Sequence, residues 1–190
     1  MTLRTKTFLT IGILLFCSVI AMYVVSSIIL LNGFAQEEER DTRQNIQRVQ
    51  DALSNELETL SNTARDYASW DDTYAFIQDA NSDYIASNLI DATFVNLQLN
   101  VIAFVHSSGK IVHAQAFDLK EEQAAAWPDD LDKHLDSQSP LLQHSTPESA
   151  VVGIIYLAQG PLLVAARPIL TSEYVGPIRG TLIVGRYLDD

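Results

Sequence analysis

Residues 97–117, LQLNVIAFVHSSGKIVHAQAF, contain two apolar segments separated by a short polar turn. The segments at 97–106 and 111–117 are rich in β-branched and aromatic residues, which suit a pleated, partly buried surface. The turn between them, Ser107–Lys110, includes Gly109. This arrangement predicts a β-hairpin, and a hairpin implies antiparallel neighbours in a sheet.

Further strand candidates lie towards the carboxyl end, at residues 150–157, 162–170 and 180–188. The tetrapeptide Ala-Gln-Gly-Pro at 158–161 predicts a tight turn between the first two. Helix-forming residues dominate 120–136, so we expect that segment to be helical. Residues 137–149 contain two prolines and are expected to form a loop.

A long helix is expected before the hairpin. Apolar residues recur there at steps of three and four, as in one stripe of a helix: Ile46, Val49, Leu53, Leu57, Leu60, Ala64 and Tyr67. No Pro or Gly interrupts residues 35–84, so we expect the helix to continue through Trp70 and Tyr74. The seven-residue spacing within the stripe predicts that its first half pairs with a second copy of the chain, as a homodimer, while its second half packs on the sheet. In the alternative, the whole stripe packs on the protein's own sheet. The long helix and five antiparallel strands together predict a two-layer α+β domain.

Residues 8–31, FLTIGILLFCSVIAMYVVSSIILL, carry no charged side chain. A helix needs about 20 apolar residues to cross a bilayer, so this segment predicts a transmembrane helix. A cleavable signal peptide is the alternative, but its apolar region is usually only about 7–15 residues long. A buried helix of a soluble protein is a further alternative. The only cysteine, Cys17, lies within this run, so the domain after it cannot contain an intramolecular disulfide.

Charge predicts the orientation of this helix. Arg4 and Lys6 precede the apolar run, whereas all 24 Asp and Glu follow it. Positive residues stay on the cytoplasmic side. We therefore expect residues 1–7 in the cytoplasm, residues 8–31 in the inner membrane, a juxtamembrane signalling helix at 32–66 and a periplasmic or extracellular domain at 45–190. The net charge of −12 makes nucleic acid an unfavourable partner.

Candidate ligand-binding residues lie in the segment Trp70-Asp71-Asp72-Thr73-Tyr74. In one interpretation, Trp70 and Tyr74 wall a cavity beneath the sheet, while Asp71 or Asp72 binds a cationic or amine-bearing ligand. In the other, the aromatic residues belong to the core and the acids cap a helix or hold a neighbouring loop. Adjacent acids on a helix diverge, so a catalytic carboxylate pair is not expected.

Arg167 stands in an otherwise apolar strand, LLVAARPIL. A guanidinium in such surroundings needs a partner or a path to water. Three partners for the guanidinium remain open, namely a ligand carboxylate, an ion pair with Asp71 or Asp72, and solvent.

His106 and His113 flank the hairpin turn. A two-residue turn would place His106 opposite Ile111 and both imidazoles on one face. Two histidines without a third ligand indicate surface residues more than a metal site.

No phosphate-binding, nucleophile or zinc motif occurs in the sequence, so we expect neither an enzyme nor a cofactor.

Three stretches together resemble a known family. They are YASWDDTYAFI at 67–77, LNVIAFVHSSGKIVHAQAFD at 99–118, and LLVAARPILTSEYVGPIRGTLIVGRYLDD at 162–190. The resemblance is to the fourth type of CHASE domain, the cyclase- and histidine-kinase-associated sensory extracellular domains, and covers roughly residues 45–190.

The resemblance implies a PAS- or Cache-like fold and an extracytoplasmic small-molecule sensor. Receptors of this kind continue into a second membrane helix and a cytoplasmic GGDEF, EAL or histidine kinase output, and that second helix is expected after Asp190. A structural or adhesive protein and an exported, membrane-tethered enzyme are the alternatives.

Overall fold

The computed structural model describes residues 3–136 and 138–188, and for residues 5, 10 and 28–41 it describes the backbone alone. The predicted cytoplasmic residues 1 and 2 and the end of the chain at 189 and 190 therefore lie outside the described residues. The chain divides into two compact units, Met1–Ala52 and Leu53–Asp190, and each is described by itself.

From Leu3 onwards, the first unit is helical and belongs to α1, which runs from Leu3 to Ala68. Within it, Lys6–Ser27 is long and apolar enough to cross a membrane, with a mean hydropathy of 2.6 and no buried residues. Farther along, Ile46 and Val49 of the predicted stripe are exposed. The length and composition of this helix thus agree with the predicted membrane span.

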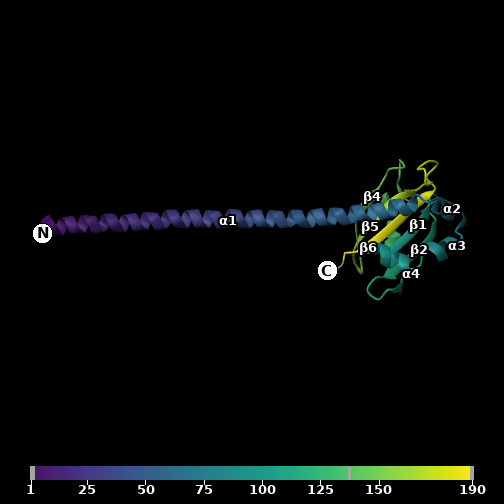
Figure 1. The fold of residues 1–190 in the computed structure, drawn as a ribbon, viewed down its shortest axis with the longest axis horizontal. Coiled ribbons are helices and arrows are strands. Elements are labelled where there is room, and N and C mark those ends of the chain that lie inside the picture. Colours follow the sequence, from purple (N-terminus) through teal and green to yellow (C-terminus); the bar gives the residue numbers. More distant parts are fainter. Residues whose placement is uncertain (1–2, 137, 189–190) are drawn as a thin grey trace. The chain divides into compact units, whose positions relative to one another are not determined.

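The second unit contains short helices and a sheet (Figure 1). The elements after α1 are α2 (Asp71–Asp79), α3 (Ser82–Asn88), α4 (Asp91–Leu97), β1 (Val101–His106), β2 (Ile111–Asp118), β3 (Gln123–Ala125), the 3₁₀ turns η1 (Leu131–His134) and η2 (Pro140–Leu142), β4 (Val151–Leu157), β5 (Gly160–Ile169) and β6 (Gly180–Tyr187).

The sheet has six strands in the order β3-β2-β1-β6-β5-β4, with antiparallel pairing throughout. The expectation of five strands was wrong, because β3 forms within the segment predicted to be helical. The Asp118 carboxylate accepts hydrogen bonds from the backbone of Lys120 (2.8 Å) and Glu121 (3.2 Å), which turns the chain back. Ala124 then pairs with Phe117 of β2. Sheet pairing thus outweighs the helix propensity of these residues.

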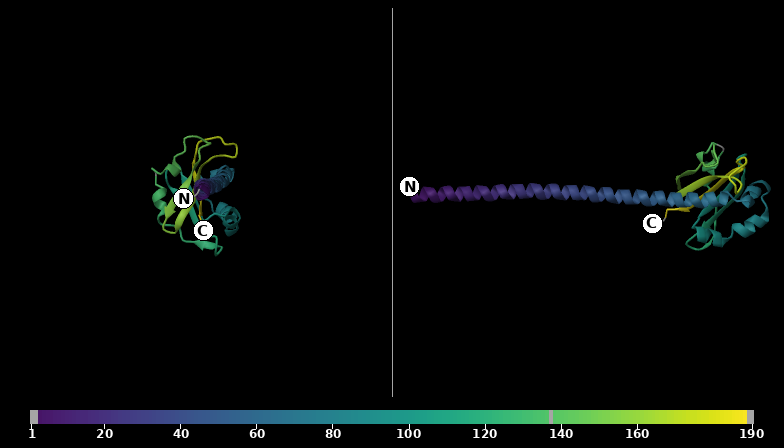
Figure 2. Two further views of the ribbon diagram at one scale, coloured as in Figure 1. Left: turned by 90° about the vertical axis from the view of Figure 1, so that its left-hand side faces the viewer. Right: turned by 45° about the horizontal axis from the view of Figure 1, so that its top comes forward.

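One face of the sheet is covered by helices (Figure 2). The carboxyl-terminal part of α1 contributes Leu60, Ala64 and Ala68 to a buried core, and Leu53 and Leu57 pack against its margin. Residues from α2, α3 and α4 join the same cluster, including Phe76, Tyr84 and Phe94. The second half of the predicted stripe therefore packs on the domain's own sheet.

The opposite face is also buried, so the two-layer prediction was incomplete. Val101, Ala103, Val164 and Ile183 face this side, and the connection between β3 and β4 covers them. The covering side chains come from the 3₁₀ turns and their flanks, and they are Trp127, Leu131, Leu135, Leu141 and Leu142. A segment expected to be helix and loop thus forms a third layer.

Candidate functional site

Trp70 lies at a break between two helices. Helix α1 ends at Ala68, whose carbonyl accepts a hydrogen bond from Leu170 N at 3.0 Å. The Trp70 backbone is extended (φ −92°, ψ 139°) and precedes α2. Its ring stacks on Tyr67 with a centroid distance of 4.2 Å and remains 36% exposed. The expectation that one helix carries residues 70–74 was therefore wrong. Trp70 instead lies at the junction between α1 and α2.

Asp71 holds a loop. Its carboxylate accepts hydrogen bonds from Ser172 N at 3.0 Å and from Ser172 Oγ at 2.8 Å. These bonds favour the ionised form, and the backbone bond is the main reason that the pKa of Asp71 is lowered. Asp72, next to it in the first turn of α2, is exposed.

Tyr74 contacts the other end of the same loop. Its hydroxyl donates to the Pro177 carbonyl at 3.2 Å, and the Arg179 guanidinium lies 3.8 Å from the centre of its ring. Arg179 Nη1 also donates to the Tyr74 carbonyl at 3.2 Å. Asp71 and Tyr74 thus fasten the β5–β6 connection to α2. Only the loop contact of Asp71 corresponds to the second interpretation, because Tyr74 is not part of the buried core. Their role in binding a ligand stays a prediction.

Arg167 connects β5 to α1 by hydrogen bonds instead of forming an ion pair with Asp71 or Asp72. Its Nε donates to Ser61 Oγ at 3.1 Å, and its Nη1 donates to the Glu148 carbonyl at 3.2 Å. Burial, reinforced by the nearby Arg65, lowers the pKa of Arg167. Among the described residues, no ion pair joins Arg167 to Asp71 or Asp72. Arg167 thus has partners other than the two acids.

The two hairpin histidines have different partners. A β-bulge between Phe104 and Val105 pairs Val105 with Ile111, so His106 is not opposite Ile111 as expected. His106 Nδ1 lies 2.9 Å from Ser108 Oγ, whereas His113 packs its ring near Phe76 and Phe104. Within residues 3–136 and 138–188, no group of three or more His, Cys, Asp or Glu is placed to hold a metal.

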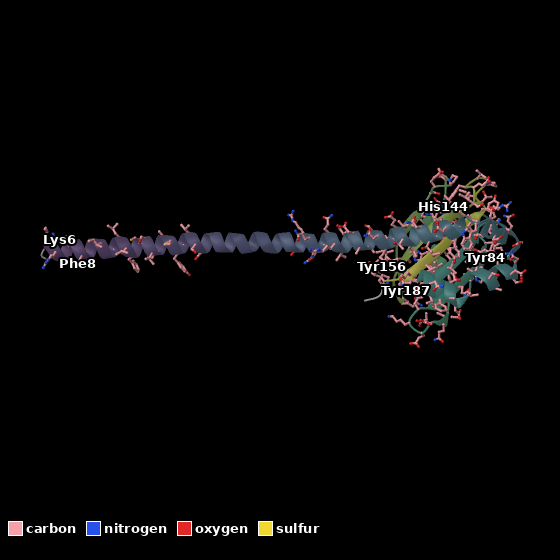
Figure 3. The ribbon with its side chains drawn as sticks, viewed as in Figure 1. Lys6, Phe8, Tyr84, His144, Tyr156 and Tyr187 are labelled. Atoms are coloured by element: carbon pink, nitrogen blue, oxygen red, sulfur yellow. The ribbon has the colours of Figure 1, made fainter. Side chains whose placement is uncertain are left out.

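Two clefts open at another part of the domain, where β2 and β6 end. The first, of about 620 Å³, lies towards the β3–β4 connection and is lined partly by Phe117, Pro128 and Pro161. The second, of about 570 Å³, lies on the helical side and is lined by Glu56, Gln98 and Arg186 among others. Both clefts share the same five residues, Asn100, Leu119, Lys120, Tyr187 and Leu188. Tyr187, marked in Figure 3, therefore lies at the boundary of the two.

Arg186 is one of the polar residues that line the second cleft. Its Nη1 lies 3.1 Å from Glu56 Oε2 of α1 and donates to Gln98 Oε1 at 3.2 Å. Asn100 also lines this cleft, and its side chain donates to the Phe117 carbonyl at 3.1 Å and accepts from Tyr187 N at 2.9 Å. Arg186 thus connects the first helix of the domain to its last strand.

Arg186 was not among the predicted site residues, although its sequence context carries a signal. Arg186 follows the apolar run TLIVG just as Arg167 follows LLVAA. The same reasoning about a guanidinium in an apolar strand applies to both residues. What the sequence does not contain is the distance between Glu56 and Arg186, which depends on how α1 crosses the sheet.

Comparison with known proteins agrees with this architecture. The family described as "CHASE4 domain" matches residues 52–190. The chain is 32% identical over 160 residues to the methanogenesis regulatory histidine kinase FilI of Methanothrix harundinacea, and it spans 18% of the length of that protein.

Solved structures share the fold at low identity. The sensor domain of the V. cholerae histidine kinase DctB is 12% identical with a TM-score of 0.55, covering 79% of this chain and 56% of that one. The extracellular domain of a protein assigned as the histidine kinase vpHK1S-Z8 is 13% identical with a TM-score of 0.53, covering 81% and 60%. The family match extends over most of the sequence. The chain therefore belongs to the family of CHASE4 domains.

Proposed function

We propose that residues 53–190 form the extracellular sensor domain of a membrane-anchored signalling receptor, and that a small molecule is its signal. Membership of the CHASE4 family and the relative named as a histidine kinase support a receptor role over a structural or adhesive one. They also favour a non-catalytic module. The output domain would be a histidine kinase, as in that relative, or a cyclic-di-GMP enzyme of the GGDEF or EAL type.

The contact between Glu56 and Arg186 is the observation that carries this proposal. A sensor must convert binding into a displacement of the segments that leave the domain. Here the segment that enters, α1, and the strand that leaves, β6, are joined by an ion pair of 3.1 Å at the wall of a 570 Å³ cleft. A ligand in that cleft would change the position of α1 against β6, and small helix shifts of this kind transmit signals in receptors.

The ligand site itself has two candidates. One is the sequence-based group of Trp70, Asp71, Asp72, Tyr74 and Arg167, and the other is the pair of clefts beside Tyr187. We favour the clefts, because Asp71, Tyr74 and Arg167 already have partners within the protein.

A thermal-shift screen distinguishes the two candidates. The whole chain in detergent micelles would be screened against a metabolite library as wild type, Trp70→Ala and Leu119→Trp. We expect a ligand that stabilises the wild type and Trp70→Ala but not Leu119→Trp, because an indole at position 119 would fill the shared part of the clefts. Retained stabilisation in Leu119→Trp and its loss in Trp70→Ala would favour the helix junction instead. A library without any stabilising compound would count against the sensor role.

We further propose that two copies pair through the part of α1 that carries Ile46 and Val49. Both side chains are exposed although they continue an apolar stripe. In a Cys17→Ser background, Ile46→Cys is expected to form a disulfide-linked dimer in membranes under mild oxidation, whereas Arg48→Cys, on another face of the helix, should link far less. Equal linking of the two variants would argue against this pairing.

A further inference from the structure

Arg186 lines the second cleft and combines an ion pair with a buried donor. Its Nη1 lies near Glu56 Oε2 and Gln98 Oε1. Its Nε is buried and has no hydrogen-bond partner among the residues that the structure describes. Buried donors almost always find an acceptor, so an unpaired one in a native fold calls for an explanation.

The two side chains of the ion pair differ in their exposure to solvent. The Arg186 side chain is 19% exposed, whereas the Glu56 side chain is 50% exposed. Glu56 can therefore return to water at little cost, while the guanidinium stays in the cleft and needs an acceptor. Glu56 is the partner that an incoming anion would displace.

The cleft offers room and a second cation for such an anion. Its volume of about 570 Å³ suits a small organic molecule. Lys120 lines it together with Arg186, and Glu122 is an acid of the same lining. Apolar side chains, among them Val95, Leu163 and Leu188, complete the wall and suit a short carbon skeleton. Pockets for small molecules commonly combine such an apolar lining with a few polar anchors.

Geometry makes the anion and Glu56 competitors. A carboxylate binds a guanidinium best through two parallel hydrogen bonds. Because Nε is enclosed in the present arrangement, it can join such a pair only if the guanidinium turns within the cleft. That turn would break the contact between Nη1 and Glu56.

We propose that the cleft beside Arg186 is a binding site for a small organic carboxylate, and that the bound carboxylate replaces Glu56 and releases α1 from β6. This inference rests on the proposed sensor function and adds the chemical class of the signal and the contact that it changes. Free inorganic phosphate shares the anionic chemistry but lacks a carbon skeleton for the apolar wall, so it should bind more weakly.

The test measures unfolding temperatures of the whole chain in micelles at constant ionic strength, with sodium acetate, sodium succinate or sodium phosphate replacing sodium chloride. The variants are Glu56→Gln, which removes the competitor, and Arg186→Gln and Arg186→Lys, which remove the guanidinium. Glu58→Gln is the matched control, because Glu58 lies on the same helix but lines a different groove.

We expect at least one carboxylate to stabilise the wild type in a saturable manner and to bind Glu56→Gln about fivefold more tightly. Arg186→Lys should lose most of the effect, since an ammonium cannot make the paired bonds. Hydrogen exchange of residues 53–60 should rise when the carboxylate binds the wild type. Glu58→Gln should behave as the wild type.

Three results would overturn the inference. They are the absence of any specific carboxylate effect in both the wild type and Glu56→Gln, equal affinity in Glu56→Gln and the wild type, and full binding by Arg186→Lys. If Arg186→Gln does not fold, the results for Glu56→Gln and Arg186→Lys decide whether the carboxylate site stands. A library compound that stabilises the wild type and Arg186→Lys equally would leave the sensor function standing while removing the carboxylate site.

Discussion

His144 lies half-buried in the β3–β4 connection (Figure 3). Its burial there disfavours a positive charge. Its Nδ1 lies 3.1 Å from Ser149 Oγ, and its enclosed Nε2 has no partner among the described residues. Burial lowers the pKa of His144, and the neighbouring Arg167 lowers it further, against an opposing effect of the Leu141 backbone. The folded state therefore favours the neutral imidazole.

This environment predicts a pH-dependent stability. Because the pKa of His144 is lower in the folded than in the unfolded chain, its contribution is fully present above about pH 6.5 and is lost as the pH falls through the folded pKa. The unfolding temperature of the wild type should therefore fall between pH 7 and pH 5, and His144→Gln should reduce that fall. His134→Gln, at an exposed position of η1, is the control and should leave the pH profile unchanged. Identical profiles for His144→Gln and the wild type would contradict this account.

Side-chain partners were the least predictable part of the candidate site. The sequence indicated that Arg167 needs a partner, but its partner is a serine on α1, 106 positions earlier in the chain. Asp71 likewise meets Ser172, 101 positions away. Such pairs depend on how elements pack, which residue types and local spacing do not specify.

Strands were predicted better than the segments that connect them. The apolar strands β1, β2, β4, β5 and β6 all lie within or close to their expected ranges, because burial produces a local pattern in the sequence. Strand β3 was missed, since Glu122 adopts a left-handed backbone (φ 49°) and Gln123–Ala125 has an exposed side-chain pattern. Strand β3 forms because it pairs with β2, and its sequence lacks the apolar pattern of a buried strand.

Two strand glycines should respond differently to an added methyl group. A Cβ at Gly180 of β6 would lie 2.4 Å from the Val105 carbonyl oxygen and 2.8 Å from Ile77, whereas a Cβ at Gly153 of edge strand β4 would meet nothing within 4 Å. Gly180→Ala is expected to lower the free energy of unfolding by about 1–3 kcal/mol. Gly153→Ala should change it by no more than about 0.5 kcal/mol. Denaturant titrations of the two variants measure the difference, and equal values would mean that β6 can move away from β1.

At the scale of the whole molecule, the sequence predicted an apolar helix followed by an α+β sensor domain. The sixth strand, β3, and the third layer of the domain both departed from that plan. The third layer was missed because its segment is irregular. Residues 126–149 have no regular periodicity, yet they bury Leu131, Leu135 and Leu141 against the sheet. Irregular segments that form part of a core carry too weak a pattern to be recognised before the fold is known.

The proposed membrane orientation makes a direct prediction. In a Cys17→Ser background, Lys110→Cys in the exposed hairpin turn should react with a membrane-impermeant maleimide in intact spheroplasts. Lys6→Cys should react only after the membrane is opened, because positive residues before the span stay inside. Both are exposed lysines, which makes them a matched pair. If Lys6→Cys were labelled in intact spheroplasts and Lys110→Cys were not, the orientation in the membrane would be opposite to the proposed one.

The central position of β6 has a mechanical consequence. The strand pairs with β1 over six residue pairs and with β5 over eight, so ladders of hydrogen bonds flank it on both sides. Antiparallel hydrogen bonds run perpendicular to the strands, and a pull along β6 therefore loads both ladders in shear instead of opening them one bond at a time. Tension on the end of the domain would move the sheet as one piece before it could peel a strand away.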